Sequence, residues 1–524
     1  MTLKTRWILV GMCALVIAAG LVAVAAAGQP QRGGTLKVGM VAEPSVLDPT
    51  HGAWNVGLFA GQFFSSILET DDTMKIVPGL AESWSADYKN KTYTFTFRKG
   101  VKWHDGKPFT MEDVKYSLET LLPKYDNRGM YLEGTRVEIQ GENKVLVRPG
   151  TWAPGIQIGR FASTDWVVYP KHLVENTDFP KSEFRRAPVG TGPFKFKEWV
   201  RGSHVAMDRY DGFWRPGKPY LDQIIVRFIA DPSSLLAALT TGDIDFAFRG
   251  IPYEAYETIK KNANLNVILD YKPNYKVLAG INQKHPILSN VAVRQALMHA
   301  INRKDLAAKA TSNVCRATDR FFAPEFMPEN LRLKVYPFDP KKAEQLLDKA
   351  GYPRKSGGTR FSISLLSRAG EAEEEKVADL LKDYFQAVGV DLNIKKVDFN
   401  TGLQLEGNYQ FDITLLKRWI LPVYASQNHI TKWIKPGTSM VNVIQYSNPK
   451  VDEGYEVWAY KATSEEERTR ALLAVEAQLT EDLPEFPLFD TAWMYVWNKR
   501  VGNPFVPARN WIQAESFENV NIVR

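Results

Sequence analysis

The sequence predicts an exported α/β protein of two or three domains, with a β-rich first half and a more helical second half. Its 524 residues are too many for one hydrophobic core. Short alternating runs separated by Gly, Pro and Asp turns are frequent before residue 230, whereas helical periodicity dominates after residue 290. Hydrophobic residues make up 44% and charged residues 24%, which is typical of a globular chain.

The N-terminus has the pattern of a secretory signal. Lys4 and Arg6 precede a long apolar run that ends in small residues at Ala27, where we expect cleavage. The run is also long enough to remain as an uncleaved anchor, which is the alternative. Cys13 lies inside the run, so a lipoprotein cut is not expected. Cleavage would leave Cys315 as the single cysteine, which excludes an intramolecular disulfide framework.

Elements of the first half follow from alternation and turn residues. Tyr93, Phe95 and Phe97 alternate with threonines, which predicts a half-buried antiparallel strand. A meander is expected from Pro188 onward, because short strand-like runs there are divided by Gly, Pro and Asp. The remaining expectations are strands at 33–41 and 144–150 and a helix at 58–69.

Helical periodicity predicts most of the elements in the second half of the chain. Residues 231–248 predict a helix, a Gly stop and a strand. Further helices are expected at 290–302, 339–351 and 371–390, and strands at 390–399 and 411–419. The run from Glu373 to Glu375 is expected to be a solvated face at a helix N-terminus, where negative charge is favoured. Residues 353–361 are the most linker-like stretch.

Motifs for common chemistries are absent from the sequence. We find no HExxH zinc motif, no G-x-S-x-G elbow and no Gly-Lys-Ser/Thr phosphate loop. Basic and acidic residues are interleaved, and the net charge is +7, so the sequence does not favour nucleic-acid binding. The sequence therefore indicates no metal site, no cofactor and no catalytic constellation.

The stretch GVKWHDGKPFT, residues 100–110, contains a histidine directly before a carboxylate. His104 and Asp105 could form a general base, which would make the protein an exported hydrolase. However, Asp105 and the glycine after it form a turn dipeptide, and Thr110 with Asp113 is close to a capping box. We therefore favour a structural role, in which the pair anchors a turn between a strand and a capped helix.

The same region carries a family resemblance. Residues 77–119 read VPGLAESWSADYKNKTYTFTFRKGVKWHDGKPFTMEDVKYSLE. Together with PVGTGPFKFKEW, NVAVRQALMHAINRKDL and DPKKAEQLLDKAGYP, they closely resemble extracellular solute-binding proteins of the peptide/nickel/opine class of ABC importers. The blocks occur in the family's order and span nearly the whole mature chain.

The resemblance implies a type II periplasmic binding fold. Two lobes joined by hinge strands would enclose the ligand, and the first lobe would carry an extra subdomain. The implied protein is a periplasmic, non-enzymatic receptor, expected as a monomer, that delivers its solute to an inner-membrane ABC permease without a cofactor. The expected boundaries are a signal peptide at 1–27, lobe I at 28–70, 190–270 and 491–524, the subdomain at 71–189, and lobe II at 271–490.

The expected ligand class follows from a departure from the pattern of peptide receptors. Those receptors generally place an aspartate soon after a GW-like segment, where it pairs with the peptide amino terminus. Here residues 411–433 contain no carboxylate after Asp412, and Lys417 and Arg418 precede Trp419 instead. A buried ammonium without a carboxylate would be costly. We therefore expect a small polar solute with an anionic group, such as an opine-like compound, an acidic peptide derivative or a sugar phosphate.

Three alternatives remain open at this point. A neutral oligosaccharide ranks second and an ordinary di- or oligopeptide third. Nickel ranks last, because the seven histidines are scattered.

The candidate ligand contacts come from the loop after the first strand, the crossing strand, the region of the missing aspartate and the returning strand. Arg418 could bind a carboxylate or phosphate in a bidentate manner, or form an internal salt bridge. Trp419 could stack on the ligand or pack in the core. The full set is Trp54, Asn55, Arg249, Asn274, Tyr275, Arg418, Trp419, Gln427, Asn428 and Trp493.

Overall fold

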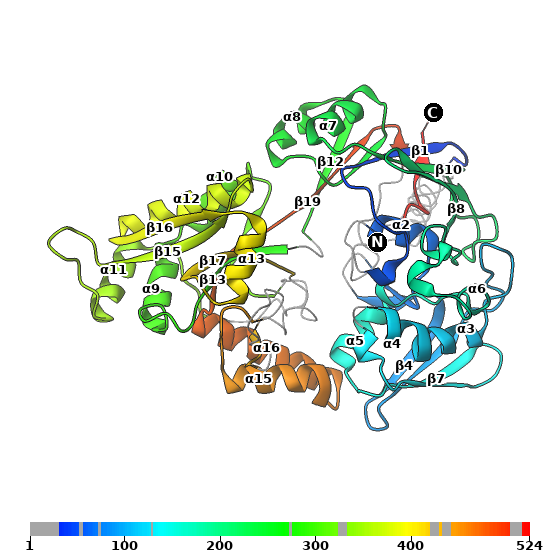
Figure 1. Cartoon of the computed structure of the whole chain (residues 1–524), viewed down its shortest axis with the longest axis horizontal. Coiled ribbons are helices and arrows are strands. Elements are labelled where there is room, and N and C mark those ends of the chain that lie inside the picture. The colour runs from blue at the N-terminus through cyan, green and yellow to red at the C-terminus, as the bar shows by residue number, and fades with distance from the viewer. Residues whose placement is uncertain are drawn as a thin grey trace, which may run out of the picture.

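The chain folds around two large sheets that lie in separate lobes (Figure 1). The computed structural model describes residues 31–51, 56–71, 75–126, 129–271, 275–322, 333–419, 429–431, 442–502 and 516–523. The lobe with the seven-stranded sheet is called lobe I, and the lobe with the six-stranded sheet is called lobe II. The two-lobed α/β fold is the predicted one.

The seven-stranded sheet of lobe I gathers strands from both ends of the chain. Its order is β12-β19-β11-β1-β10-β9-β8, with β1 parallel to β10 and β11. The predicted helix, stop and strand are confirmed as α7, Gly242 with φ of +82°, and β11. The bounds are β1 Thr35–Met40, β8 Phe194–Val200, β9 His204–Arg209, β10 Gln223–Phe228, α7 Pro232–Thr241, β11 Phe246–Phe248, β12 Leu265–Asp270 and β19 Trp493–Asn498.

A four-stranded antiparallel sheet forms the extra subdomain of lobe I. Its order is β4-β5-β7-β6, and Tyr93, Phe95 and Phe97 of β5 are fully buried, as the alternation predicts. The helix expected at 58–69 is too long. α2 ends at Phe63, since Phe64 is extended and Ser65 donates to the Thr191 carbonyl oxygen. The bounds are α2 Gly57–Phe63, β2 Leu68–Thr70, β3 Ile76–Pro78, β4 Ala81–Asp87, β5 Thr92–Phe97, α3 Met111–Tyr116, β6 Arg136–Ile139, β7 Lys144–Arg148 and α5 Pro154–Phe161.

The six-stranded sheet of lobe II has the order β14-β18-β13-β17-β15-β16. Its strands share one apolar core with α9, α10, α11 and α12, to which α12 contributes Val377, Leu381 and Phe385. The bounds are β13 Tyr275–Ile281, α9 Val291–Ala300, α10 Arg303–Ala310, β14 Arg316–Ala317, α11 Pro340–Lys349, β15 Phe361–Arg368, α12 Ala372–Ala387, β16 Val390–Val397, α13 Phe399–Gly407, β17 Ile413–Trp419 and β18 Glu485–Asp490.

The glutamate run of α12 is only partly solvated, contrary to expectation. Glu375 pairs with Lys396 at 2.7 Å on the surface. Glu374 is buried, and its carboxylate accepts the backbone N–H of Arg368 at 2.6 Å. The difference arises because successive helical residues point in different directions.

Two antiparallel segments connect the lobes. One leads from β12 in lobe I to β13 in lobe II, and the other returns from β18 through Thr491 and Ala492 to β19 (Figure 1). Thr491 fastens the two segments together, because its backbone N–H and its hydroxyl both donate to the Tyr275 carbonyl oxygen, at 2.9 and 2.8 Å. These segments are the hinge strands that the resemblance implies.

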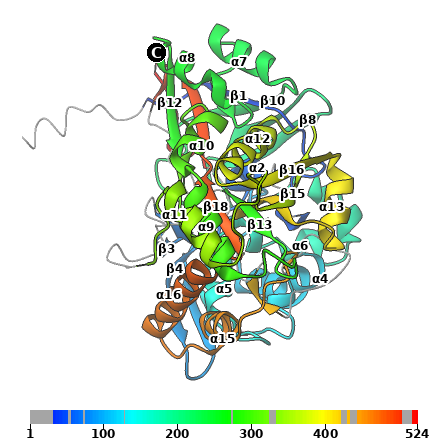
Figure 2. The same cartoon turned by 90° about the vertical axis from the view of Figure 1, so that its left-hand side faces the viewer.

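A helical pair in lobe II reaches the subdomain of lobe I. The pair consists of α15 (Pro449–Glu456), the π-helical turn η10 (Val457–Lys461) and α16 (Glu465–Asp482). η10 contacts α5, and both views place α15 and α16 beside α5, far from β12 (Figures 1 and 2). Among the described residues, the lobes thus contact each other beside the hinge and, separately, where η10 meets α5.

Candidate functional site

A pocket of about 510 Å³ lies beside the hinge, and both lobes line it. Its size suits a small organic solute. Lobe I contributes residues from the ends of β11 and β19, and lobe II contributes residues from β13, β17 and the start of α12. The lining residues are Arg249, Gly250, Ile251, Tyr253, Tyr275, Glu371, Glu373, Lys417, Thr491, Ala492, Trp493 and Met494.

Arg249 and Trp493 form the lobe I wall. The guanidinium carbon of Arg249 lies 3.5 Å from the centroid of the Trp493 ring, which is a close cation–π stack. Arg249 has a φ of +61°, a left-handed conformation that costs free energy in a non-glycine residue. The next residue must be a glycine, because a Cβ on Gly250 would lie 2.4 Å from Val41 Cγ1. The tight turn after β11 therefore aims Arg249 at Trp493.

Two tyrosines form the part of the wall next to the hinge. Tyr275 begins β13 and is half-buried, and its carbonyl oxygen is held by Thr491. The Tyr253 hydroxyl donates to the Ala492 carbonyl oxygen at 3.1 Å, and burial raises the pKa of this phenol, so it remains a neutral donor. The returning segment therefore holds both tyrosines in place, since Thr491 bonds to the Tyr275 carbonyl oxygen and Ala492 accepts from the Tyr253 hydroxyl.

Charged groups form the lobe II wall. Lys417 Nζ lies 3.4 Å from Glu373 Oε1 and 3.8 Å from Glu371 Oε2. Both carboxylates belong to the start of α12, where the helix dipole favours negative charge. The wall therefore adds one cation and two anions to the pocket that Arg249 also lines.

Three of the ten candidate residues come together in this pocket. Arg249, Tyr275 and Trp493 are far apart in sequence and share its lining. The candidates Trp54, Asn55, Asn274, Gln427 and Asn428 lie outside the described residues, as does the side chain of Trp419.

Arg418 lies on the other face of β17. Its neighbour Lys417 lines the pocket, and successive strand residues point to opposite faces. Arg418 Nε lies 3.7 Å from Glu485 Oε1, and His429 Nε2 lies 3.1 Å from Glu485 Oε2. Burial tends to raise the pKa of Glu485, but His429 and Arg418 outweigh burial and lower the pKa. The internal salt bridge is thus the role that the geometry shows for Arg418.

Lys417, Tyr253, Glu371 and Glu373 were missed by sequence reasoning. One signal for Lys417 was available, because the alternation of 413–419 separates it from Arg418. No local signal in the sequence predicts that Glu371 lines the pocket. This residue follows a turn, and it reaches the pocket only because α12 packs on the sheet.

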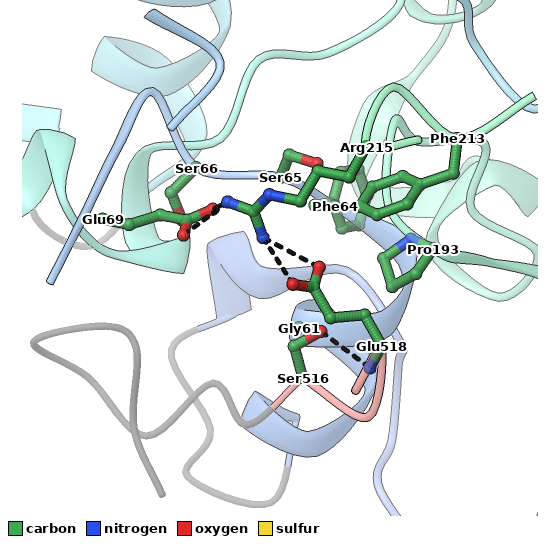
Figure 3. A pocket seen from close by; sticks show the side chains of 10 residues that line it. All are labelled: Gly61, Phe64, Ser65, Ser66, Glu69, Pro193, Phe213, Arg215, Ser516 and Glu518. Carbon is green, nitrogen blue, oxygen red and sulfur yellow. Dashed lines mark hydrogen bonds and ion pairs between the residues drawn. The ribbon is translucent and has the colours of Figure 1, made fainter. Parts of the chain in front are cut away.

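A second cavity, of about 20 Å³, is too small for a solute and has a structural role. Arg215 lies between two carboxylates there: both oxygens of Glu69 accept at 2.7 Å and both oxygens of Glu518 at 2.8 Å (Figure 3). This bridge ties the C-terminal segment to lobe I.

The His104–Asp105 pair anchors a turn, as favoured from the sequence. His104 Nδ1 accepts from the backbone N–H of Gly190 at 3.2 Å, and Asp105 accepts from the backbone N–H of Lys107 at 3.0 Å. The Asp105 carboxylate pairs with His172, at 2.7 Å. Thr110 and Asp113 form the predicted capping box. Burial lowers the pKa of His104 to about 4.

Comparison with known proteins decides the family. The family model of bacterial extracellular solute-binding proteins, family 5, middle region, matches residues 75–436. The chain belongs to this family. Among curated relatives, the oligopeptide-binding protein AppA of Bacillus subtilis is 28% identical over 82% of the chain and 81% of AppA. The glutathione-binding protein GsiB of Escherichia coli K12 is 28% identical over 82% of the chain and 83% of GsiB.

Solved structures share the fold. The substrate-binding protein CtaP of Listeria monocytogenes has a TM-score of 0.81 at 22% identity, over 94% of this chain and all of CtaP. AgaA of A. tumefaciens R10, solved with agropinic acid, has a TM-score of 0.70 at 23% identity, over 94% of this chain and 99% of AgaA.

These matches establish the protein as a substrate-binding receptor of an ABC importer, and not an enzyme. Receptors of this family act outside the cytoplasm together with a membrane permease. Within the described ranges, no helix is long and apolar enough to cross a membrane, and no group of three or more His, Cys, Asp or Glu side chains could hold a metal.

Proposed function

We propose that the receptor captures a small polar solute with an anionic group in the pocket beside the hinge. Opine-like compounds, acidic peptide derivatives and sugar phosphates have this chemistry. The observation that carries the proposal is Arg249, which is buried and stacked on Trp493 at the lobe I wall. A guanidinium held by an aromatic ring is positioned to bind a carboxylate or phosphate in a planar, bidentate manner.

Hinge closure is the proposed mechanism. The pocket draws its walls from both lobes, so a solute makes its full set of contacts only when the lobes are closed. Binding free energy then stabilises the closed state, which the permease recognises. AgaA, which shares this fold, was solved with agropinic acid, and this supports a ligand that carries an acidic group.

Peptides are the second candidate, and a specific observation favours them. Glu371 and Glu373 line the pocket, so they supply the carboxylates that the sequence lacks after Trp419. A ligand ammonium group could replace Lys417 beside them. AppA and GsiB, which bind an oligopeptide and glutathione, agree with this alternative. A neutral oligosaccharide would rely on the aromatic rings of Trp493 and Tyr275.

Several features complete the proposal. We propose that the signal is cleaved after Ala27, that the mature receptor is a periplasmic monomer, and that the lobes follow the boundaries predicted from the sequence. Support for the boundaries comes from the sheets, because β12 ends at Asp270 in lobe I and β13 begins at Tyr275 in lobe II. Likewise, β18 ends at Asp490 before the return to lobe I.

The first test identifies the solute. Purified receptor is denatured, and the released small molecules are analysed by mass spectrometry. A solute with a net negative charge supports the proposal, an ordinary peptide without a net negative charge supports the alternative, and a neutral sugar contradicts both.

The second test addresses Arg249. Calorimetry with the identified solute should show affinity reduced about tenfold to several hundredfold in Arg249→Gln, because one or two charged hydrogen bonds are lost. Arg227→Gln is the matched control, since Arg227 is an exposed arginine of the same sheet. Equal affinity of the two variants would remove Arg249 from the site.

A further inference from the structure

The second contact between the lobes lies below the crossing strand β19 in Figure 1, on the other side of it from β12. It joins α5 of the subdomain to η10 of lobe II, and Tyr88 of the subdomain to Glu465 at the start of α16 (Figures 1 and 2). None of the residues that line the pocket belongs to these three elements. The contact is therefore separate from the proposed ligand site.

The lobe I side of the contact is a rigid platform. Gln157 of α5 is fully buried, and its amide nitrogen donates to the carbonyl oxygens of Tyr131 and Thr151, at 2.9 Å each. Its amide oxygen accepts from the backbone N–H of Ala153 at 3.1 Å and from the Tyr93 hydroxyl at 3.2 Å. These bonds fix the start of α5 on the four-stranded sheet.

Gly155 meets Trp458 at the centre of the contact. A Cβ on Gly155 would lie 2.4 Å from the Trp458 carbonyl oxygen and 3.1 Å from Cε2 of its indole. The φ of Gly155 is not left-handed, so close approach, and not backbone conformation, is what requires a glycine here. Trp458 lies in the π-helical turn, and its side chain is buried. Separation of the lobes would expose this indole to water.

The lobe II side is firmly connected to the rest of lobe II. α16 has 18 residues and is therefore about 27 Å long. Its C-terminal end is held by Arg294, which donates to the Asp482 carbonyl oxygen at 2.6 Å. Near its N-terminal end, Glu465 accepts from the Tyr88 hydroxyl of lobe I at 3.0 Å. The helix thus carries motion of lobe II directly to the contact.

We propose that this contact, centred on Gly155 and Trp458, is a latch that sets the balance between open and closed receptor before any solute binds. Rotation about the hinge displaces the most distant parts of the lobes furthest, so opening must break the contact. The buried indole and the Tyr88–Glu465 bond stabilise the closed form by amounts that do not depend on the solute. The apparent affinity for every solute then scales with the fraction of receptor that the latch keeps closed.

The inference rests on the two-lobed fold and not on the solute proposed above. It can therefore be tested on the mature receptor freed of solute by unfolding and refolding. Gly155→Ala is the test variant, because alanine favours a helix more than glycine does and should harm only the close approach. Gly357→Ala is the matched control, since no atom lies within 4 Å of its added Cβ.

Small-angle X-ray scattering and amide hydrogen exchange report the outcome. In Gly155→Ala, we expect a larger radius of gyration and about tenfold faster exchange at residues 457–461, with β13 unchanged. Tyr88→Phe should shift the same quantities in the same direction, by about twofold to tenfold in exchange. Tyr88→Phe carries the test if Gly155→Ala does not fold.

The proposal is overturned if the variants scatter and exchange like Gly357→Ala. It is also overturned if faster exchange extends through β13, since the contact would then be ordinary core packing. Because no solute is present, neither result depends on which compound the pocket binds.

Discussion

At the scale of single residues, the surroundings of a side chain decide which of its possible roles it has. His104 looks like half of an acid–base pair, but its ring accepts a hydrogen bond from Gly190 and its pKa lies near 4. It is consequently neutral at physiological pH, and its role is to join the turn at 104–106 to the loop at 190–192. Arg418 and Lys417 are adjacent cations, yet only Lys417 reaches the pocket.

His104 predicts a loss of stability in acid. The pKa of His104 in the folded protein, about 4, lies below its ordinary value of 6.5. Its contribution to the free energy of unfolding is therefore complete above pH 6.5 and is lost as the pH falls through 4. Between pH 7 and pH 5, the loss amounts to about 2 kcal/mol of unfolding free energy. Denaturant unfolding of His104→Gln should lack this part of the pH dependence, while solute affinity at pH 7 stays unchanged. Weaker binding with full stability would place His104 in the site instead.

At the scale of elements, α16 binds a neighbouring segment through Glu476, an acidic residue that is fully buried in the middle of the helix. The carboxylate of Glu476 accepts the backbone N–H groups of Phe321 and Phe322, at 2.9 Å each. Burial raises the pKa of Glu476 to about 7 in spite of these bonds. The helix therefore carries a group that titrates close to neutrality.

Glu476 predicts the opposite pH dependence to His104. The pKa of Glu476 in the folded protein, about 7, exceeds its ordinary value of 4.5. Its contribution to the free energy of unfolding is therefore complete below pH 4.5 and is lost as the pH rises through 7. The free energy of unfolding should fall by about 2.5 kcal/mol between pH 5 and pH 8 because of this group. Thermal or denaturant unfolding of Glu476→Gln should show a smaller loss over this range than the parent, whereas Glu481→Gln, an exposed position of the same helix, should behave like the parent. Identical pH profiles for both variants would contradict the titration of Glu476.

At the scale of the whole molecule, an ion network secures the hinge. Asp490, at the end of β18, accepts from Lys276 of β13 and, at 3.0 Å, from Arg316 Nε of β14. The guanidinium carbon of Arg316 also lies 4.8 Å from the ring centroid of Tyr271, next to the first crossing segment. One buried carboxylate thereby connects both segments that join the lobes.

Asp490→Asn should destabilise the receptor by about 3–5 kcal/mol, because it leaves Lys276 buried without its counter-charge. Asp211→Asn removes an exposed carboxylate that pairs with Arg209 at 2.7 Å, and it should cost less than about 1 kcal/mol. Denaturant unfolding of both variants measures the difference. A cost for Asp490→Asn no larger than that of Asp211→Asn would show that water screens the network.

Most elements could be predicted because their signals are local. The alternation at 92–97, the capping box at Thr110 and the glycine stop after α7 each depend on neighbours a few residues away. The failures have a physical reason too. α2 ends early because Ser65 bonds to Thr191, 126 residues further along the chain, and no local pattern encodes that partner.

The sequence by itself determined the family, the two-lobed α/β fold and three residues of the pocket. These depend on local periodicity and on motifs preserved as continuous stretches. Only the tertiary structure decided that Lys417 and not Arg418 faces the pocket, that Glu371 and Glu373 line it together with Arg249, and that Gly155 touches Trp458. Such facts depend on which faces of distant elements pack together, and that packing is settled by the whole chain at once.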